Sequence, residues 1–454
     1  MTIQPDYVKE ELLHELSESF CMHNQLPPDL FTRYRIKRGL RNADGTGVLV
    51  GASHLGNVHG YILNEGEREP IEGRLTYRGY NVYDLIHGLE QENRFGFEEI
   101  GYLLMCGKLP SRRQLAEFQH TIGLERALPD NFTEDMIMRA PSRDIMNKLA
   151  SATLALYSYD ANPDETTVEN IMRQGISLMA KFPVIISHAY QAKRRYFDND
   201  SMFLHVPDPN RSTAENILHL IRPTGEFNDD EAKLLDRCLI LHAEHGGGNN
   251  SSFTVRVTSS SGTDTYSAIA AAVSSLKGPR HGGANLRVVK QFEEMKENIH
   301  NWKDETEVGN YLRKILNKEA GDGSGLIYGM GHAVYTISDP REVILKQRAK
   351  HLAYEKGFEE EYNMLCSIER LAPGIFAEEK GSSKPVCANV DLFSGLIYNM
   401  LGISEDLYTP LFAIARVPGW CAHRVEEVIF ANRIIRPAYK YLGVRQKYKP
   451  IEER

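Results

Sequence analysis

The stretch GMGHAVYTISDPR (329–341) combines a glycine-bordered histidine, His332, with a guanidinium, Arg341, at the start of a predicted helix. The two glycines before the imidazole, Gly329 and Gly331, leave room for a ligand to approach the backbone. Asp339 and Pro340 are good residues for the N-cap and the first helical position. Two roles stay open for Arg341: forked bonding to a ligand carboxylate, or an exposed position on the helix.

Helical periodicity dominates the sequence on both sides of this stretch. Apolar residues recur every three or four positions, which predicts helices at 111–128, 169–190, 229–245, 265–278, 286–302, 304–318, 339–357 and 390–402. A further apolar stripe consists of Val8, Leu12, Leu16 and Phe20. Short strands are expected only at 48–66 and 74–77, and the Gly/Ser-rich stretch 246–263 is expected to be a loop. The predicted fold class is therefore all-α.

Length and composition restrict the protein class. The 454 residues exceed what one hydrophobic core usually holds, so two domains are expected. The net charge is −8 and no Lys/Arg-rich block occurs, which argues against nucleic acid or an anionic membrane as the main partner. The six cysteines are scattered without a CxxC pair, and no apolar run of about 20 residues, signal peptide or transit peptide is evident. We therefore expect a cytoplasmic protein with reduced thiols.

Two histidines lie three residues apart in HAEHGGGNN (242–250), at the end of a predicted helix. At this spacing His242 and His245 can point the same way, and the negative end of the helix dipole favours a cationic ring. Three roles stay open for this pair: capping the last helical carbonyls, contacting an anionic substrate, or binding a metal.

A third histidine, His281, lies in GPRHGGAN (278–285), directly before a predicted helix. The positive end of that helix is expected to lower the imidazole pKa, so that a neutral ring can donate a hydrogen bond to a carbonyl oxygen. The alternative is an ordinary histidine in a turn made by glycine and proline.

Charged residues at or in predicted helices complete the candidate chemistry. Asp391 is either an ordinary N-cap or a carboxylate base, which the helix terminus would keep ionised and therefore weak. Such a base removes a carbon-bound proton only if a placed donor stabilises the resulting oxyanion. Arg416, in the apolar segment IARVPGW (414–420), needs either a ligand or a structural salt bridge.

Taken together, these stretches resemble the citrate synthase family. The motifs that carry the resemblance are LTYRGY (75–80), ILHAEH (240–245), LKGPRHGGAN (276–285), GMGHAVYTISDPR (329–341), NVDLFSG (389–395), IARVPGW (414–420) and IIRP (434–437). They occur in the family's order, so the resemblance covers most of the chain. It implies a large helical domain, 1–282 with 398–454, and a smaller one, 283–397, that closes over the site; residues 1–70 carry none of these motifs and have no assigned role.

The resemblance also implies residue roles. His281 would bond the acetyl-CoA thioester oxygen, Asp391 would remove a methyl proton, and His332 would polarise the oxaloacetate ketone and protonate the alkoxide. The oxaloacetate carboxylates would be held by His245, Arg341, Arg416 and Arg436. The CoA site would be lined by Gly329, Met330, Gly331 and Asn389. Because Arg436 is expected from the neighbouring subunit, the assembly would be at least a homodimer, and no metal or cofactor is expected.

Departures from the family pattern keep a second substrate open. Ala388 stands where many relatives carry proline, 246–248 is unusually glycine-rich, and Leu392 and Phe393 adjoin the expected base. These residues could alter the acyl pocket, so condensation of propionyl-CoA to 2-methylcitrate is the alternative activity. Outside the family, a metal-dependent hydrolase using the histidine cluster, or a non-catalytic helical dimer that binds a metabolite, are the competing hypotheses.

Overall fold

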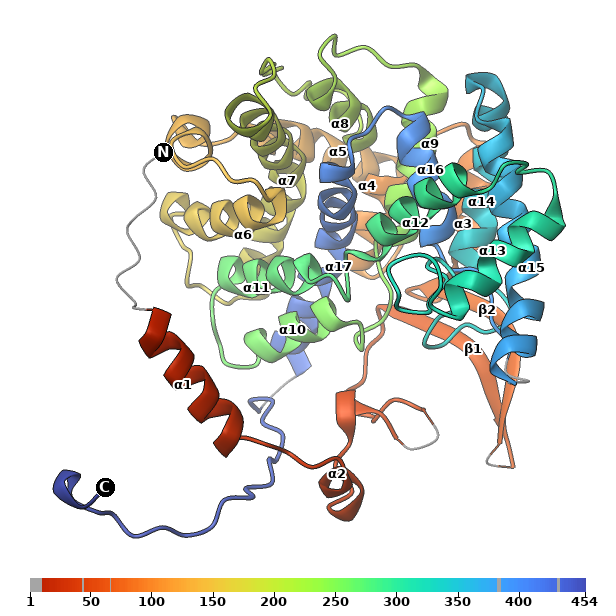
Figure 1. Cartoon of the computed structure of the whole chain (residues 1–454). Helices are drawn as coiled ribbons and strands as arrows, with labels where there is room; N and C mark the ends of the chain where they lie inside the picture. The colour runs from red at the N-terminus through yellow and green to blue at the C-terminus, as the bar shows by residue number, and fades with distance from the viewer. Residues whose placement is uncertain (1–9, 43–44, 66, 382–384, 431–432) are drawn as a thin grey trace. The chain divides into compact units, whose positions relative to one another are not determined.

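The computed structural model describes residues 10–42, 45–65, 67–381, 385–430 and 433–454. By its internal contacts the chain divides into two units, Met1–Ala52 with Arg436–Arg454, and Ser53–Ile435. Helices make up most of the described residues, and strands form only one small sheet (Figure 1). The predicted all-α fold class is confirmed.

The larger unit, Ser53–Ile435, contains most of the helices. They are α3 Val82–Gln91, α4 Phe97–Cys106, α5 Arg112–Glu125, α6 Ile145–Leu156, α7 Val168–Phe197, α8 Thr213–Ile221, α9 Asp229–His242, α10 Asn250–Ser259, α11 Thr265–Lys277, α12 Ala284–Asn298, α13 Glu305–Leu316, α14 Pro340–Lys356, α15 Glu359–Lys380, α16 Asp391–Met400 and α17 Tyr408–Phe430. The other unit contains α1 Glu10–His23 and α2 Asp29–Arg33. No helix among the described residues is both long and apolar enough to cross a membrane.

Most of these helices follow from the apolar periodicity. The segments predicted at 111–128, 169–190, 229–245, 265–278, 286–302, 304–318, 339–357 and 390–402 correspond to α5, α7, α9, α11, α12, α13, α14 and α16. The stripe through Leu12, Leu16 and Phe20 lies in α1, whereas Val8 falls outside the described residues.

The loop prediction for 246–263 is wrong over its central part, which forms α10. Serine, threonine and valine are poor helix formers, but Val255 is fully buried and α10 packs against α11 and α17. Tertiary packing therefore decides the conformation here against local propensity.

The sheet is an antiparallel hairpin of β1 Gly56–Asn64 and β2 Glu67–Tyr77, extended by the short β3 Tyr80–Asn81. The second strand is longer than the predicted 74–77. A Cβ on Gly73 would lie 2.1 Å from the Ser338 carbonyl oxygen, and one on Gly60 would lie 2.8 Å from that of Val334. These glycines therefore allow the chain that leads into α14 to lie directly against the hairpin.

The substitution Gly73→Ala is expected to lower the free energy of unfolding by about 1–3 kcal/mol, because the added methyl group overlaps backbone that cannot move freely. Urea unfolding measures the change. Gly88→Ala is the control: no atom lies within 4 Å of the added Cβ in α3, so stability should rise by about 0.5–1 kcal/mol. Equal stability of Gly73→Ala and the wild type would show that the hairpin does not support this segment.

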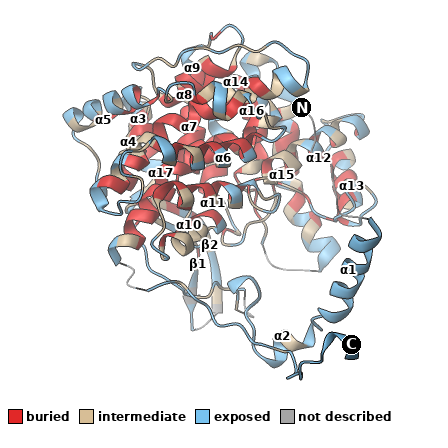
Figure 2. Ribbon diagram, turned by 90° about the vertical axis from the view of Figure 1, so that its left-hand side faces the viewer, coloured by how far each residue is buried: buried red, intermediate tan, exposed pale blue. Residues whose placement is uncertain are grey.

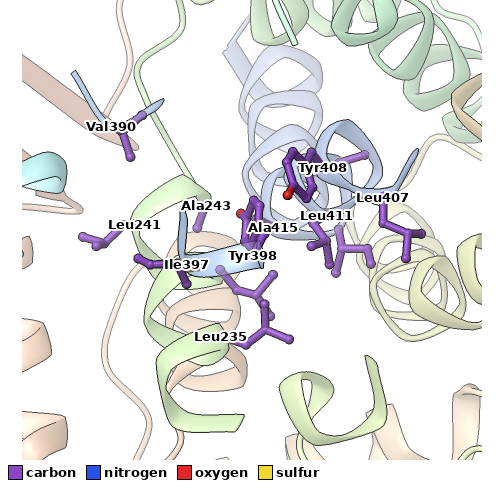
Figure 3. Packing of buried hydrophobic residues seen from close by; sticks show 14 of the residues in the cluster. Leu235, Leu241, Ala243, Val390, Ile397, Tyr398, Leu407, Tyr408, Leu411 and Ala415 are labelled. Carbon is purple, nitrogen blue, oxygen red and sulfur yellow. The ribbon is translucent and has the colours of Figure 1, made fainter. Parts of the chain in front are cut away.

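Buried residues concentrate in the central helices, including α6, α7, α11 and α17, whereas α1 is exposed along its length (Figure 2). Helix α17 packs against α4, α7, α9, α10 and α11. Figure 3 shows apolar side chains of α9, α16 and α17 meeting around Tyr398 and Tyr408, whose ring centroids are 5.1 Å apart. This cluster holds together the three helices that carry or adjoin His245, Asp391 and Arg416.

Candidate active site

The backbone that follows His332 fixes the proton on its imidazole. The amide groups of Val334 and Tyr335 both donate to Nδ1, each at 3.1 Å. Since Nδ1 is an acceptor, the ring proton is on Nε2. The imidazole also stacks on Tyr335, with ring centroids 4.7 Å apart. His332 is therefore held by its own loop as an Nε2–H donor.

The glycines beside His332 have a local structural reason. Gly329 and Gly331 have φ values of 82° and 89°, which glycine adopts without strain. Gly331 donates its N–H to the Cys387 carbonyl at 2.7 Å, and the Gly329 carbonyl accepts from the N–H of Asn389 at 2.8 Å. The bridge between Met330 and Ala388 completes this pairing of two distant segments.

The Asn389 side chain then joins the His332 loop to the start of α16. Its Nδ2 donates to the Gly331 carbonyl at 2.9 Å, and its Oδ1 accepts from the N–H of Asp391 at 3.0 Å. The N-cap of α16 is Val390, so the alternative role of Asp391 as an ordinary N-cap is wrong, and its carboxylate is left for another role. These contacts do not test the CoA-lining roles of Gly329, Met330, Gly331 and Asn389, which remain predictions.

Burial sets the protonation of Asp391. It raises the carboxyl pKa to about 6, an effect that Arg341 partly offsets. We expected the helix terminus to keep this group at its ordinary acidity, and that expectation is wrong because desolvation outweighs the helix dipole. A carboxylate with a raised pKa is a stronger base, and it is still largely ionised at neutral pH.

His245 lies against His332, with the ring planes nearly perpendicular and the centroids 5.1 Å apart. Its Nε2 is buried and has no hydrogen-bond partner among the described residues. Burial and Arg341 lower the pKa of His245 well below its usual value, so the ring is neutral. Helix α9 ends at His242, so His245 lies in the loop beyond the helix rather than capping its last turn.

Arg341 is buried, so the predicted alternative of an exposed helix position is wrong. Its Nε and Nη2 donate to the two carboxylate oxygens of Asp339, at 3.0 and 2.7 Å. Asp339 also accepts from the Arg341 backbone and is the N-cap of α14, as predicted, with Pro340 in the first turn. Burial by itself lowers the pKa of Arg341, but the carboxylate of Asp339 raises it by more. Arg341 therefore stays cationic.

Arg416 has no structural salt bridge among the described residues. Its Nε donates to the His242 carbonyl at 2.6 Å, and its guanidinium carbon lies 4.8 Å from the centre of the Phe412 ring. Both Nη1 and Nη2 are buried without a hydrogen-bond partner among the described residues. Burial lowers the pKa of Arg416 to about 10, so it is cationic at neutral pH. An unsatisfied buried cation is costly, and such a group fits an anionic ligand.

His281 has the opposite tautomer to His332. The Ser251 backbone N–H points at His281 Nε2 from 3.4 Å, and the Ser251 hydroxyl lies 3.0 Å from the same nitrogen. The hydroxyl donates to Asn249 Oδ1 at 3.0 Å and accepts from the indole N–H of Trp420 at 3.1 Å. The backbone N–H of Ser251 therefore identifies Nε2 as an acceptor, with the ring proton on Nδ1. Burial and Arg416 lower the pKa of His281 to about 4, so the predicted neutral ring is obtained mainly by burial.

A buried polar network that the motifs did not indicate lies behind the 244–248 loop. Glu244 accepts from the Gly246 backbone at 2.5 Å and lies 3.0 Å from Nε2 of His423, whose Nδ1 accepts from Arg256. Burial by itself raises the pKa of Glu244, but the contacts with His423 and Arg416 lower it by more, so the pKa lies below its usual value. A Cβ on Gly247 would lie 3.2 Å from Arg256 Nε, so the glycine-rich loop leaves room for this network.

Arg436 is exposed and belongs to the unit of 1–52 and 436–454, and its assignment to oxaloacetate stays a prediction.

Within the described part of the chain, no group of three or more His, Cys, Asp and Glu side chains is arranged to hold a metal ion. His242, one of the three histidines of the hydrolase hypothesis, has its Nδ1 2.8 Å from the Cys238 carbonyl oxygen.

The fold and these residues define an all-α enzyme with acid–base groups beside buried cationic side chains. A family model described as "Citrate synthase, C-terminal domain" matches residues 45–438. Citrate synthase of Synechocystis sp. is 34% identical over 84% of this chain and 89% of its own length. A 2-methylcitrate synthase of Shewanella oneidensis is 33% identical over 84% and 92%.

A solved structure agrees with these sequence relatives. The ternary complex of citrate synthase from Thermoplasma acidophilum with carboxymethyl coenzyme A and oxaloacetate matches with a TM-score of 0.75 and 28% identity, covering 92% of this chain and 99% of that one. The chain belongs to the citrate synthase family, whose members are condensing enzymes of the transferase class.

Proposed function

We propose that this chain condenses acetyl-CoA with oxaloacetate to give citrate and CoA. The observation that carries the proposal is the pair of imidazoles with opposite tautomers, Nδ1–H on His281 and Nε2–H on His332. Together with Asp391, whose pKa is raised to about 6, they supply two placed proton donors and one base. The comparisons support this reaction through the names of most relatives, among them that of Synechocystis sp..

In the proposed mechanism, Asp391 removes a proton from the thioester methyl group while Nδ1–H of His281 donates to the thioester oxygen. The resulting enol carbon forms a bond to the ketone carbon of oxaloacetate, and the ketone oxygen takes the proton from Nε2 of His332. Water then cleaves the thioester of citryl-CoA, which releases citrate and CoA. A hydrogen-bond donor at the thioester oxygen is required because a carboxylate is too weak a base to form a free enolate.

We assign the oxaloacetate carboxylates to Arg416, Arg341 and His245. The two unsatisfied nitrogens of Arg416 and the unsatisfied Nε2 of His245 support this assignment, since a carboxylate would complete their hydrogen bonds. In this proposal Arg436 of a neighbouring subunit completes the set, so that the working form is a homodimer or a larger assembly built from it.

We also propose that residues 283–397 form the smaller domain, which closes over oxaloacetate and excludes water before the enol forms. Proton transfers and hydrogen bonds suffice for each step, so the proposal includes no metal or cofactor. A cytoplasmic location is supported by the six cysteines, all of which are described and free.

The proposal is tested by thiol release from acetyl-CoA and, separately, from propionyl-CoA, each with oxaloacetate. Faster release with acetyl-CoA is the expected result. Preference for propionyl-CoA would assign 2-methylcitrate synthesis to the same residues, an alternative supported by the relative of Shewanella oneidensis and by the departures near Asp391. Absence of release from both thioesters would contradict the proposed reaction.

A further inference from the structure

A cavity of about 430 Å³ lies beside His281, outside the group of residues assigned to oxaloacetate. It is lined by Asn250, Ser275, Gly278, Pro279, Arg280 and His281. Among the described residues that line it, Arg280 is the one cationic side chain, and it directly precedes the proposed thioester ligand in sequence. A molecule whose carbonyl group is held by His281 can therefore extend into this cavity and meet Arg280.

The guanidinium of Arg280 has no structural role in the described part of the chain. The residue is exposed, and its side chain forms no ion pair, hydrogen bond or ring contact with any other described residue. Its neighbour Lys277 differs, because Lys277 Nζ lies 3.5 Å from a carboxylate oxygen of Asp144. In a chain of net charge −8, an uncompensated arginine at a cavity provides a local attraction for anions.

We propose that Arg280 binds a phosphate group of the acyl-CoA substrate and thereby contributes to affinity for CoA thioesters. This inference rests on the proposed function, in which His281 holds the thioester end of the same molecule. The phosphates of CoA are the anionic groups of that substrate, and a guanidinium bonds a phosphate through two parallel N–H···O contacts. An exposed arginine suits the part of the ligand that stays in contact with water, whereas Arg341 and Arg416 are buried.

The variant Arg280→Gln is expected to raise the KM for acetyl-CoA by about 5–10-fold, because a hydrogen bond between charged groups contributes only modestly at an exposed site. The KM for oxaloacetate and kcat should stay within about twofold, since chemistry and carboxylate binding use other residues. Arg112→Gln is the matched control: Arg112 is an exposed arginine at the start of α5, and it should leave all parameters unchanged.

Truncated ligands decide whether phosphate is what Arg280 recognises. Binding of CoA, dephospho-CoA and pantetheine to the full chain is measured by calorimetry in the presence of oxaloacetate, for wild type, Arg280→Gln and Arg280→Lys. The expected result is weaker CoA binding in Arg280→Gln, partial recovery in Arg280→Lys, and no effect on pantetheine, which lacks phosphate. A loss retained with dephospho-CoA would assign the diphosphate, and a loss absent there would assign the 3′-phosphate.

Two outcomes would overturn the inference. Unchanged CoA binding in Arg280→Gln would show that the arginine does not contact the ligand, and equal weakening of all three ligands would show an indirect effect of the substitution. Because binding is measured without turnover, failure of the proposed function is distinguishable: wild type would then release no thiol from acetyl-CoA, whatever Arg280 does to CoA affinity.

Discussion

The variant Asp391→Asn is expected to lose about a thousandfold in kcat for thiol release, since it removes the general base while leaving the shape of the side chain almost unchanged. Oxaloacetate binding should survive, because its proposed ligands His245, Arg341 and Arg416 are intact. Stopped-flow or endpoint detection of the thiol gives kcat, and calorimetry gives the oxaloacetate affinity. More than a tenth of wild-type turnover in Asp391→Asn would rule out Asp391 as the base.

The pH dependence of kcat/KM and of stability tests the role of Asp391 independently. The base must be ionised, and its pKa is about 6, so kcat/KM of the wild type should fall tenfold per pH unit below about pH 6. The folded pKa is raised above the ordinary 3.8, so the folded state binds this proton more tightly than the unfolded chain. Stability from this group is therefore lost as pH rises from about 4 to 6, and Asp391→Asn should be more stable than wild type above pH 6.

Asp236 provides the matched control for this experiment. Asp236 is fully buried, and burial raises the pKa of its carboxyl group to about 7. It accepts from the backbone N–H groups of Gly96 and Phe97, at 2.9 and 3.0 Å, and has no place in the candidate site. Asp236 also accepts from Arg237 Nη1 at 2.6 Å, so Asp236→Asn should reduce stability by breaking this buried ion pair, while kcat and the fall of activity near pH 6 are retained. If the fall of kcat/KM below about pH 6 disappeared in Asp236→Asn, the ionisation of Asp391 would not be its cause.

The sequence predicted those features that depend on local pattern. Helices such as α7 and α14 follow from apolar spacing and capping residues, which are properties of neighbouring positions. Helix α10 could not be predicted, because its stability comes from packing on α11 and α17 rather than from its own residues. The same limit applies to the length of β2, which is set by pairing with β1.

For the candidate site, the motifs indicated the reactive residues but not their environments. The pKa of Asp391 depends on burial, which no local pattern reports, so the argument from the helix dipole did not predict that this pKa is raised. The tautomer of His281 depends on the backbone N–H of Ser251, which lies in α10, thirty residues earlier in the chain. His423, which binds Glu244, carries no motif at all; a histidine inside an apolar helix was the only available signal.

The variant Arg416→Met is expected to weaken oxaloacetate binding by at least about a hundredfold, because it removes a buried partner of a ligand carboxylate. It should not destabilise the free protein, because loss of the bond from Nε to the His242 carbonyl is offset by removal of a desolvated cation. Nη1 and Nη2 of Arg416 are buried without partners among the described residues, so the wild type without ligand bears the cost of a desolvated cation. In thermal denaturation, wild type should gain about 2.7 kcal/mol of stability at a hundred times the dissociation constant of oxaloacetate, and the variant should gain almost nothing at that concentration.

Arg424→Met, in the same helix, separates ligand binding from burial of an arginine. Arg424 is as buried as Arg416, but its Nε, Nη1 and Nη2 donate to Thr265, Ser259 and Thr263, at 2.9, 3.1 and 2.7 Å. Its removal breaks three hydrogen bonds, of which those to Thr265 and Ser259 are buried, so stability should fall by roughly 3 kcal/mol while the oxaloacetate affinity of the folded protein is unchanged. If Arg416→Met instead lost as much stability as Arg424→Met and kept its oxaloacetate affinity, Arg416 would be a structural residue, and the anion site would have to be sought elsewhere.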